Sequence, residues 1–238
     1  MTNRDVVEGL RPTGFALPLR WIGAAGVVMV VGIIGLGPAM GGPDSWASDA
    51  VAQYRDTLDG STFLDVAPVR FGAYALLTAF EMFFFAGLWS WVRRIAPRSM
   101  ASPLVALAAA GFVAGGIASD GFNFAQAIAL HGGRGVSVDA NLAVISDVAS
   151  TLVIIEVNVC LAVAVAAVSA IGLRNRTLPA ALCWYGLVAA AASALPGFFA
   201  SSFPVFVLSN LLRLAFVVAI SVLMWLGRVP GGEEVMAG

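Results

Sequence analysis

The sequence predicts an all-α integral membrane protein, a bundle of six transmembrane helices with both termini in the cytoplasm. Three observations support this fold class. Hydrophobic residues make up 60% of the 238 residues and charged residues only 11%, whereas ordinary soluble domains carry about 25% charged residues. Several apolar stretches reach the length of about 20 residues that crosses a ~30 Å hydrocarbon core. Arginines gather on alternate connections, as they do where positive charge sets the orientation of each span.

Residues 1–20 form a polar cytoplasmic segment, and the first span is predicted at about residues 21–40. A basic flank before an apolar stretch also describes a secretory signal peptide, whose apolar region is about 7–15 residues long. The stretch here is longer, and Asp5 and Glu8 lie in its flank. We therefore expect the first span to be retained, with cleavage as the alternative.

Residues 41–70 form the longest polar connection, which we place outside the cell. Ser48, Val51 and Tyr54 follow helical spacing, and Gly60 is a stop signal. This pattern predicts a short amphipathic helix on the membrane surface or across the end of the bundle. A solvated acidic loop is the alternative.

The five remaining spans are apolar stretches separated by short polar connections. Trp89, Trp91, Arg93 and Arg94 form an aromatic and basic anchor at the end of the second span. The fourth span is longer than a bilayer requires, so we expect it to tilt or to project. Together the spans complete a transmembrane domain over residues 21–227, followed by a cytoplasmic tail over residues 228–238. These five spans are predicted at about residues 71–92, 103–130, 141–171, 178–200 and 203–226.

The distribution of arginine predicts which side of the membrane each connection faces. Cytoplasmic connections are enriched in lysine and arginine, and this chain has thirteen arginines and no lysine. With the N-terminus inside, nine arginines fall on the cytoplasmic side and three outside, while Arg213 lies within a span. Both termini are therefore expected in the cytoplasm. The nine are Arg4, Arg11, Arg20, Arg93, Arg94, Arg98, Arg174, Arg176 and Arg228, and the three are Arg55, Arg70 and Arg134.

Composition excludes several classes of function. Without lysine, no retinal or pyridoxal Schiff base can form. His131 is the single histidine, which rules out bis-histidine haem ligation, and Cys160 and Cys183 form no CxxC pair. A net charge of −1 gives no basic footprint for nucleic acid. The sequence contains no metalloprotease, serine hydrolase or P-loop motif. We therefore expect no enzyme activity, no cofactor and no metal site.

The strongest functional indication is a set of charged side chains inside the predicted spans. Glu81, Glu156 and Arg213 fall near the middle of the second, fourth and sixth spans. A charge at the bilayer centre costs roughly 2.5–3.5 kcal/mol on insertion scales, and such residues usually face the bundle interior and pair. We therefore expect Arg213 to form an ion pair with Glu81 or Glu156 and the other glutamate to be neutral. Which glutamate pairs is left open.

Further polar residues extend this set into a hypothetical mid-membrane binding cluster. Asp120 and Asn123 share one face of the third span, His131 follows on the same face, and Asn210 lies in the sixth span. Such a stripe suits a water-lined vestibule, or equally interhelical hydrogen bonds worth about 0.6 kcal/mol each. Asp147, near the start of the fourth span, suits a helix N-terminus, where acids are favoured.

Residues Leu173–Leu187 read LRNRTLPAALCWYGL, a basic turn followed by Leu-Pro and an apolar helix with aromatic residues and Gly-Leu. This segment resembles one that recurs in the bacterial multi-pass membrane family catalogued as domain of unknown function 4386. The six-span layout over residues 20–226 and the outer loop after the first span are similar too. Because that family has no assigned function, the resemblance implies a fold and no chemistry.

Three functional hypotheses follow. The first is a non-enzymatic structural or accessory membrane protein that packs with itself or with a membrane complex, favoured by the small-residue repeat of Gly111, Gly115 and Ser119. The second is a small secondary transporter or proton-coupled carrier that uses the three midplane charges. The third is a lipid-modifying enzyme. Each hypothesis has the lipid bilayer as a partner, and the lysine-free, alanine- and valine-rich composition points to a bacterial inner membrane.

Overall fold

The computed structural model describes residues 18–39, 47–59, 62–131, 139–198 and 203–230, and its regular elements there are all α-helices. In chain order, these helices are α2 (Leu19–Ala39), α3 (Ala50–Asp59), α4 (Thr62–Ile95), α5 (Ala101–His131), α6 (Ala140–Asn175), α7 (Ala180–Ala192), α8 (Leu195–Phe198) and α9 (Phe203–Trp225).

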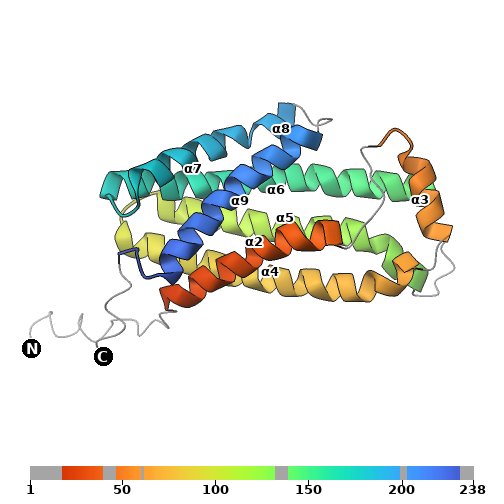
Figure 1. The fold of residues 1–238 in the computed structure, drawn as a ribbon, viewed down its shortest axis with the longest axis horizontal. Coiled ribbons are helices and arrows are strands. Elements are labelled where there is room, and N and C mark those ends of the chain that lie inside the picture. Colours follow the sequence, from red (N-terminus) through yellow and green to blue (C-terminus); the bar gives the residue numbers. More distant parts are fainter. Residues whose placement is uncertain (1–17, 40–46, 60–61, 132–138, 199–202, 231–238) are drawn as a thin grey trace, which may run out of the picture.

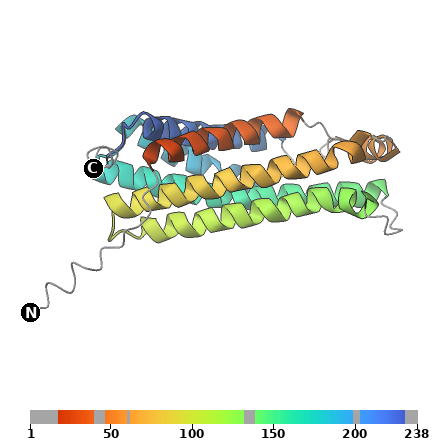
Figure 2. The same cartoon turned by 90° about the horizontal axis from the view of Figure 1, so that it is seen from below.

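Three long helices form one layer of the bundle, and shorter helices cover it. Helices α4, α5 and α6 lie side by side, with α5 packed against both neighbours (Figure 1). Helices α2 and α9 pack together in a second layer, which is seen from the side in Figure 2. Helix α7 lies against α6 and α9. Helix α2 begins and α9 ends at one end of the bundle, while α3 lies at the other end, against the start of α6.

The helices meet in an apolar core and approach one another closely at small residues. Phe84, Trp91 and Phe216 are among the largest fully buried side chains. On the seam between α5 and α6, a Cβ atom added at Gly115 would collide with Val157. Close approach of this kind drives helix association in lipid, where apolar burial alone gives no preference for protein over lipid. The small-residue repeat of the third predicted span therefore lies at a contact within the chain, between α5 and α6.

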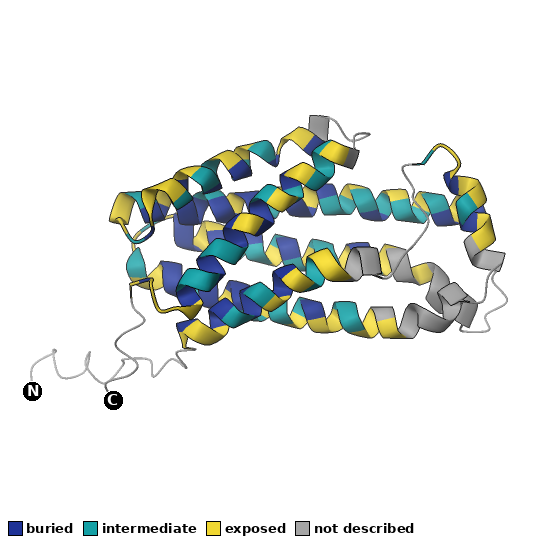
Figure 3. Cartoon of the chain, viewed as in Figure 1, coloured by how far each residue is buried: buried dark blue, intermediate teal, exposed yellow. Residues whose placement is uncertain are grey.

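The outer surface is apolar where a soluble protein would be polar. Leu107, Ile145 and Val188, on three different helices, are 71%, 65% and 65% exposed, and exposed residues cover the outer faces of the bundle (Figure 3). A helix that is hydrophobic all round belongs in a protein core or in a membrane. In the described part of the chain, four helices are long and apolar enough to cross a membrane, namely Phe71–Ile95, Ala101–Phe122, Ala140–Asn175 and Pro204–Trp225, and Leu19–Gly35 and Ala180–Ala192 are shorter apolar helices.

The connection between the first two predicted spans differs from the prediction in length. The amphipathic helix expected after Ser48 is confirmed as α3, which ends at Asp59. Residues 62–70 were assigned to the polar connection, but they form the start of α4. The hydropathy of this segment is lowered by Asp65 and Arg70, so a criterion based on apolar length places the helix start too late. Helix α4 is thus longer than the bilayer requires.

The prediction of one continuous fifth span over residues 178–200 is wrong. Helix α7 ends at Ala192, a turn follows at Ser193, and α8 is a separate short helix. Pro196 explains the break, because a proline has no amide hydrogen and its ring clashes with the carbonyl group four residues earlier in a continuing helix. Helix α7 packs against α6 and α9, and α8 packs against α9 (Figure 1).

Candidate functional site

Arg213 of α9 is fully buried at the seam between α9 and α6. Its Nη1 donates a hydrogen bond to the backbone carbonyl oxygen of Asn158 at 2.7 Å, and its Nη2 donates to Oδ1 of Asn210 at 2.6 Å. Such short distances are typical of charge-assisted hydrogen bonds. A carbonyl oxygen that accepts the amide of its own helix still has a second lone pair. Helix α6 can therefore bind the guanidinium without giving up a helical hydrogen bond.

Asn210 is held ready for this contact by its own helix. It precedes Arg213 by three residues, so both side chains lie on one face of α9. Its Nδ2 donates to the carbonyl oxygen of Phe206 at 3.1 Å. With the amide nitrogen occupied inside the helix, Oδ1 is directed to the guanidinium. Asn210 thus supplies a neutral acceptor where a carboxylate was expected.

Two buried donors at this seam have no hydrogen-bond acceptor within the described part of the chain. They are Nε of Arg213 and Nδ2 of Asn158. A buried donor without an acceptor costs roughly 1–3 kcal/mol. The seam therefore holds a positive charge with hydrogen-bonding capacity that its neighbours do not fully use.

The predicted ion pair between Arg213 and a glutamate is wrong. Among the described residues Arg213 forms no ion pair, and its hydrogen bonds go to Asn158 and Asn210. Glu156 precedes Asn158 by two residues, which is about 200° around a helix of 3.6 residues per turn. Its side chain is exposed on the outside of α6. Counting along the spans placed the charges at one depth, but the rotation of each helix about its axis decides what they face.

Glu81 meets a second acid rather than an arginine. It is 7% exposed on α4 and interacts electrostatically with Asp120, which is half-buried on the neighbouring helix α5. The same register brings the rings of Phe85 and Phe112 to a centroid distance of 5.2 Å. No described arginine forms an ion pair with either carboxyl group. Two such carboxyl groups repel each other when both are ionised.

Hydroxyl groups join α5 to α6. The side-chain oxygens of Ser119 and Ser150 are 2.6 Å apart, and each residue is 2% exposed. Nearby, Oγ of Ser146 donates to the carbonyl oxygen of Phe122 at 2.7 Å. Interhelical hydrogen bonds of this type contribute about 0.6 kcal/mol on average in a membrane protein. These polar groups therefore hold the helices together.

The structure describes only some of the side chains in the outer half of the predicted polar stripe. Asn123 and His131 belong to α5, but their side chains lie outside the described residues, so their role stays a prediction. The explanation given for Asp147 is wrong, because α6 begins directly after Asp139, which caps it. The Asp139 side chain accepts a backbone amide hydrogen at 2.8 Å. Aspartate is a favoured N-cap residue, so its place just before an apolar stretch was the signal that sequence reasoning missed.

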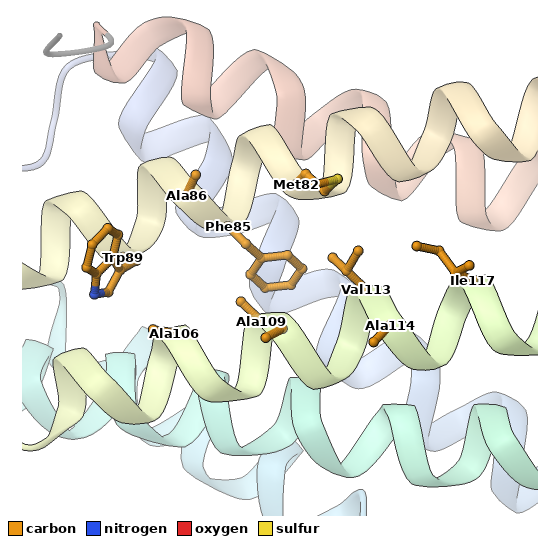
Figure 4. Close-up of a pocket in the computed structure, with 10 residues that line it drawn as sticks. Met82, Phe85, Ala86, Trp89, Ala106, Ala109, Val113, Ala114 and Ile117 are labelled. Atoms are coloured by element: carbon orange, nitrogen blue, oxygen red, sulfur yellow. The ribbon is translucent and has the colours of Figure 1, made fainter.

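The cavities and grooves described between the helices are apolar. A cavity of about 10 Å³ lies between α4, α6 and α9, and all its lining residues are apolar. A buried water molecule needs two to four polar partners, and the residues that line this cavity provide no such partner. Two larger grooves open on the outer surface, one of about 350 Å³ between α4 and α5 (Figure 4) and one of about 410 Å³ between α2 and α4. None of the three is lined by a charged residue.

Within the described residues, no group of three or more His, Cys, Asp or Glu side chains is placed to hold a metal ion. No family model matches this chain, and neither a curated protein nor a solved structure matches it. The resemblance of Leu173–Leu187 to the family catalogued as domain of unknown function 4386 therefore stays a prediction.

Proposed function

We propose that this chain is a non-enzymatic protein of the bacterial inner membrane with a structural or accessory role, which it performs by associating with a second copy of itself. The mid-membrane polar groups support a structural role, because Arg213 is bound by Asn158 and Asn210, and Ser119 is bound to Ser150. The apolar outer faces support residence in lipid.

The proposal includes six spans with both termini in the cytoplasm. Helix α2 and the pair formed by α7 and α8 run beside the four long apolar helices and would complete six crossings. The asymmetry of nine inner and three outer arginines supports this orientation. In a chain with its native cysteines replaced by alanine, Arg55→Cys should react with an impermeant thiol reagent in intact cells. Arg98→Cys should react only after lysis, and the reverse pattern would contradict the orientation.

The observation that carries the proposal is the exposure of Glu156. This glutamate lies near the middle of α6 and belongs to an exposed stripe with Leu152, Val159 and Val163, which are 53%, 44% and 39% exposed. The spacings of four, three and four residues place all of them on one face of the helix. Ionisable residues inside membranes almost always face protein or water. In a single copy this carboxyl group would lie against hydrocarbon. We therefore expect a protein neighbour on this face of α6.

A second copy is the neighbour that suits this face best. A carboxyl group can take part in hydrogen bonds across a protein interface, which hydrocarbon does not offer. A twofold axis, the commonest symmetry of homo-oligomers, brings the same surface of two copies together. Across such an axis, the exposed stripe that contains Glu156 would meet the same stripe of the second copy.

Cross-linking in membranes tests the association. In a chain with Cys160 and Cys183 replaced by alanine, Val159→Cys places a thiol on the proposed interface. Mild oxidation should produce a covalent dimer on a denaturing gel. Val188→Cys, on the exposed face of α7, is the control and should stay monomeric. No dimer from Val159→Cys, or equal dimer from both variants, would overturn the proposed interface.

A proton-coupled carrier is the second candidate, and the proximity of Glu81 and Asp120 favours it. Two neighbouring carboxyl groups in mid-membrane are suited to binding and releasing a proton. A carrier must let water reach them, whereas a structural pair can stay dry. In the cysteine-free chain, Glu81→Cys should not react with a small charged thiol reagent if our proposal is correct. Rapid reaction from the aqueous phase would favour the carrier.

A further inference from the structure

The groove between α4 and α5 is long, apolar and open to the outside of the bundle. Alanines of α5 line it on one side, and Phe85 and Met82 of α4 line it on the other (Figure 4). Trp89 lies at one end and Ile117 at the other. The volume of about 350 Å³ falls within the ~300–1,000 Å³ that is usual for small-molecule sites. The groove is open and runs along α4 and α5, so it fits a flexible hydrocarbon chain.

The Trp89 end of the groove is basic. The guanidinium carbon of Arg93 lies 5.7 Å from the centroid of the Trp89 ring, one helical turn beyond the groove. Arg94 follows it, and Arg98 lies in the turn between α4 and α5; all three arginines are exposed. Nε of Arg94 donates a hydrogen bond to the carbonyl oxygen of Ser90 at 3.4 Å. Arg93 lies over the ring of Trp89, and Trp89 lines this end of the groove.

We propose that this groove binds an anionic phospholipid, with one acyl chain along α4 and α5 and the phosphate at Arg93. The site combines an apolar groove with positive charge at one end. A phospholipid matches it, because its acyl chain is apolar and its phosphate is negatively charged. Arginine binds phosphate through paired N–H donors, and tryptophan is enriched at the level of lipid headgroups. The inference rests on the proposed insertion of α4 and α5 into the bilayer.

The arrangement selects for a net negative headgroup. A zwitterionic phosphatidylcholine carries a quaternary ammonium that the arginines at residues 93, 94 and 98 would repel, whereas phosphatidylglycerol carries only the phosphate charge. Basic residues near a membrane surface contribute about 1 kcal/mol each towards anionic lipid, or about fivefold in affinity. The groove between α2 and α4 is similar in size, but among the described residues only Arg20 neighbours its Trp21 in the sequence. We therefore assign the preference to the α4–α5 groove.

Native mass spectrometry of the purified full-length chain tests the site. Phosphatidylglycerol and phosphatidylcholine with the same acyl chains are added in turn, and the bound fraction is measured against lipid concentration. The wild-type chain should bind phosphatidylglycerol more tightly. Arg93→Gln should reduce that preference by about fivefold, while the matched charge loss Arg55→Gln, at the other end of the bundle, should leave it unchanged. Free glycerol phosphate should not displace the lipid, because it lacks the acyl chain.

A second pair of variants separates the contribution of the apolar groove to lipid binding from that of the arginine charge. Ala110→Phe fills the groove, whereas Ala118→Phe adds the same ring to an exposed position of α5 that does not line it. Ala110→Phe should weaken binding of both lipids, and Ala118→Phe should weaken neither. Equal binding of the two lipids by the wild-type chain, or an unchanged preference in Arg93→Gln, would overturn the proposal. A dimer that Ala110→Phe dissociates would assign the groove to a protein partner instead. Thiol labelling of Arg98→Cys tests membrane insertion separately.

Discussion

Replacing Asn210 with leucine tests how the buried charge of Arg213 is stabilised. The substitution removes the acceptor that lies 2.6 Å from Nη2 and leaves the guanidinium, which is 0% exposed, with the Asn158 carbonyl alone among its described acceptors. Hydrogen bonds to charged groups contribute about 1.5–3 kcal/mol. We expect Asn210→Leu to lower the free energy of unfolding by that amount, a roughly 10- to 150-fold change in the equilibrium constant.

A double-mutant cycle with Arg213→Met separates this effect from lost packing. Replacing a buried charge with an apolar side chain of similar volume is often neutral or stabilising, whereas removing one partner of a buried pair is costly. In the Arg213→Met background, Asn210→Leu should therefore cost less than about 0.6 kcal/mol, the average for a membrane interhelical hydrogen bond. The two substitutions should be strongly non-additive.

The assay is reversible unfolding of the purified chain in mixed detergent micelles, followed by tryptophan fluorescence. Asn141→Leu is the control, because Asn141 is an exposed amide at the start of α6 and its replacement should change stability little. Additive costs in the cycle would refute the reasoning, since Asn210 would then stabilise the bundle without acting on Arg213. A cost for Asn210→Leu no larger than that of Asn141→Leu would refute it as well.

Two further predictions concern the seam between α5 and α6. Ser119→Ala and Ser150→Ala should each destabilise the bundle by about 0.6 kcal/mol, and the double variant should cost hardly more, because the two hydroxyls share one hydrogen bond at 2.6 Å; additive losses in the same unfolding assay would contradict this. Gly115→Ala should destabilise it more strongly, because the new Cβ atom collides with Val157, whereas Gly116→Ala meets nothing within 4 Å. Equal stability of the two alanine variants would show that the seam is looser than described.

Apolar length and arginine distribution were enough to predict the helical class and the approximate position of most helices. These two signals could not predict how far the helices extend beyond the lipid. Helix α4 begins at Thr62, in a stretch whose polar residues lower its hydropathy, because a helix continues wherever its backbone bonds and packing allow. In the fifth span the signal was visible, since Pro196 interrupts the apolar stretch, but apolar length outweighed it.

The candidate site shows a sharper limit. Depth can be counted along a span, and it placed the glutamates and Arg213 at one level. Partner choice depends on helix rotation and on which helices are neighbours, and neither follows from counting. Helix rotation turns Glu156 outward and Asn158 inward, only two residues apart. The acceptor on α6 is a backbone carbonyl oxygen, which every residue has, so no sequence pattern could identify it.

The central claim is that Glu156 marks the surface by which two copies associate in the membrane. Single-molecule photobleaching of the labelled chain in liposomes measures the dimer fraction as a function of protein density in the bilayer. We predict a dimer for the wild-type chain that Glu156→Gln retains, because glutamine keeps a hydrogen-bonding side chain of the same length. Glu156→Leu should weaken it by about 1–2 kcal/mol, or roughly 5- to 30-fold. A monomeric wild-type chain, or a Glu156→Leu dimer as stable as the wild type, would contradict the claim.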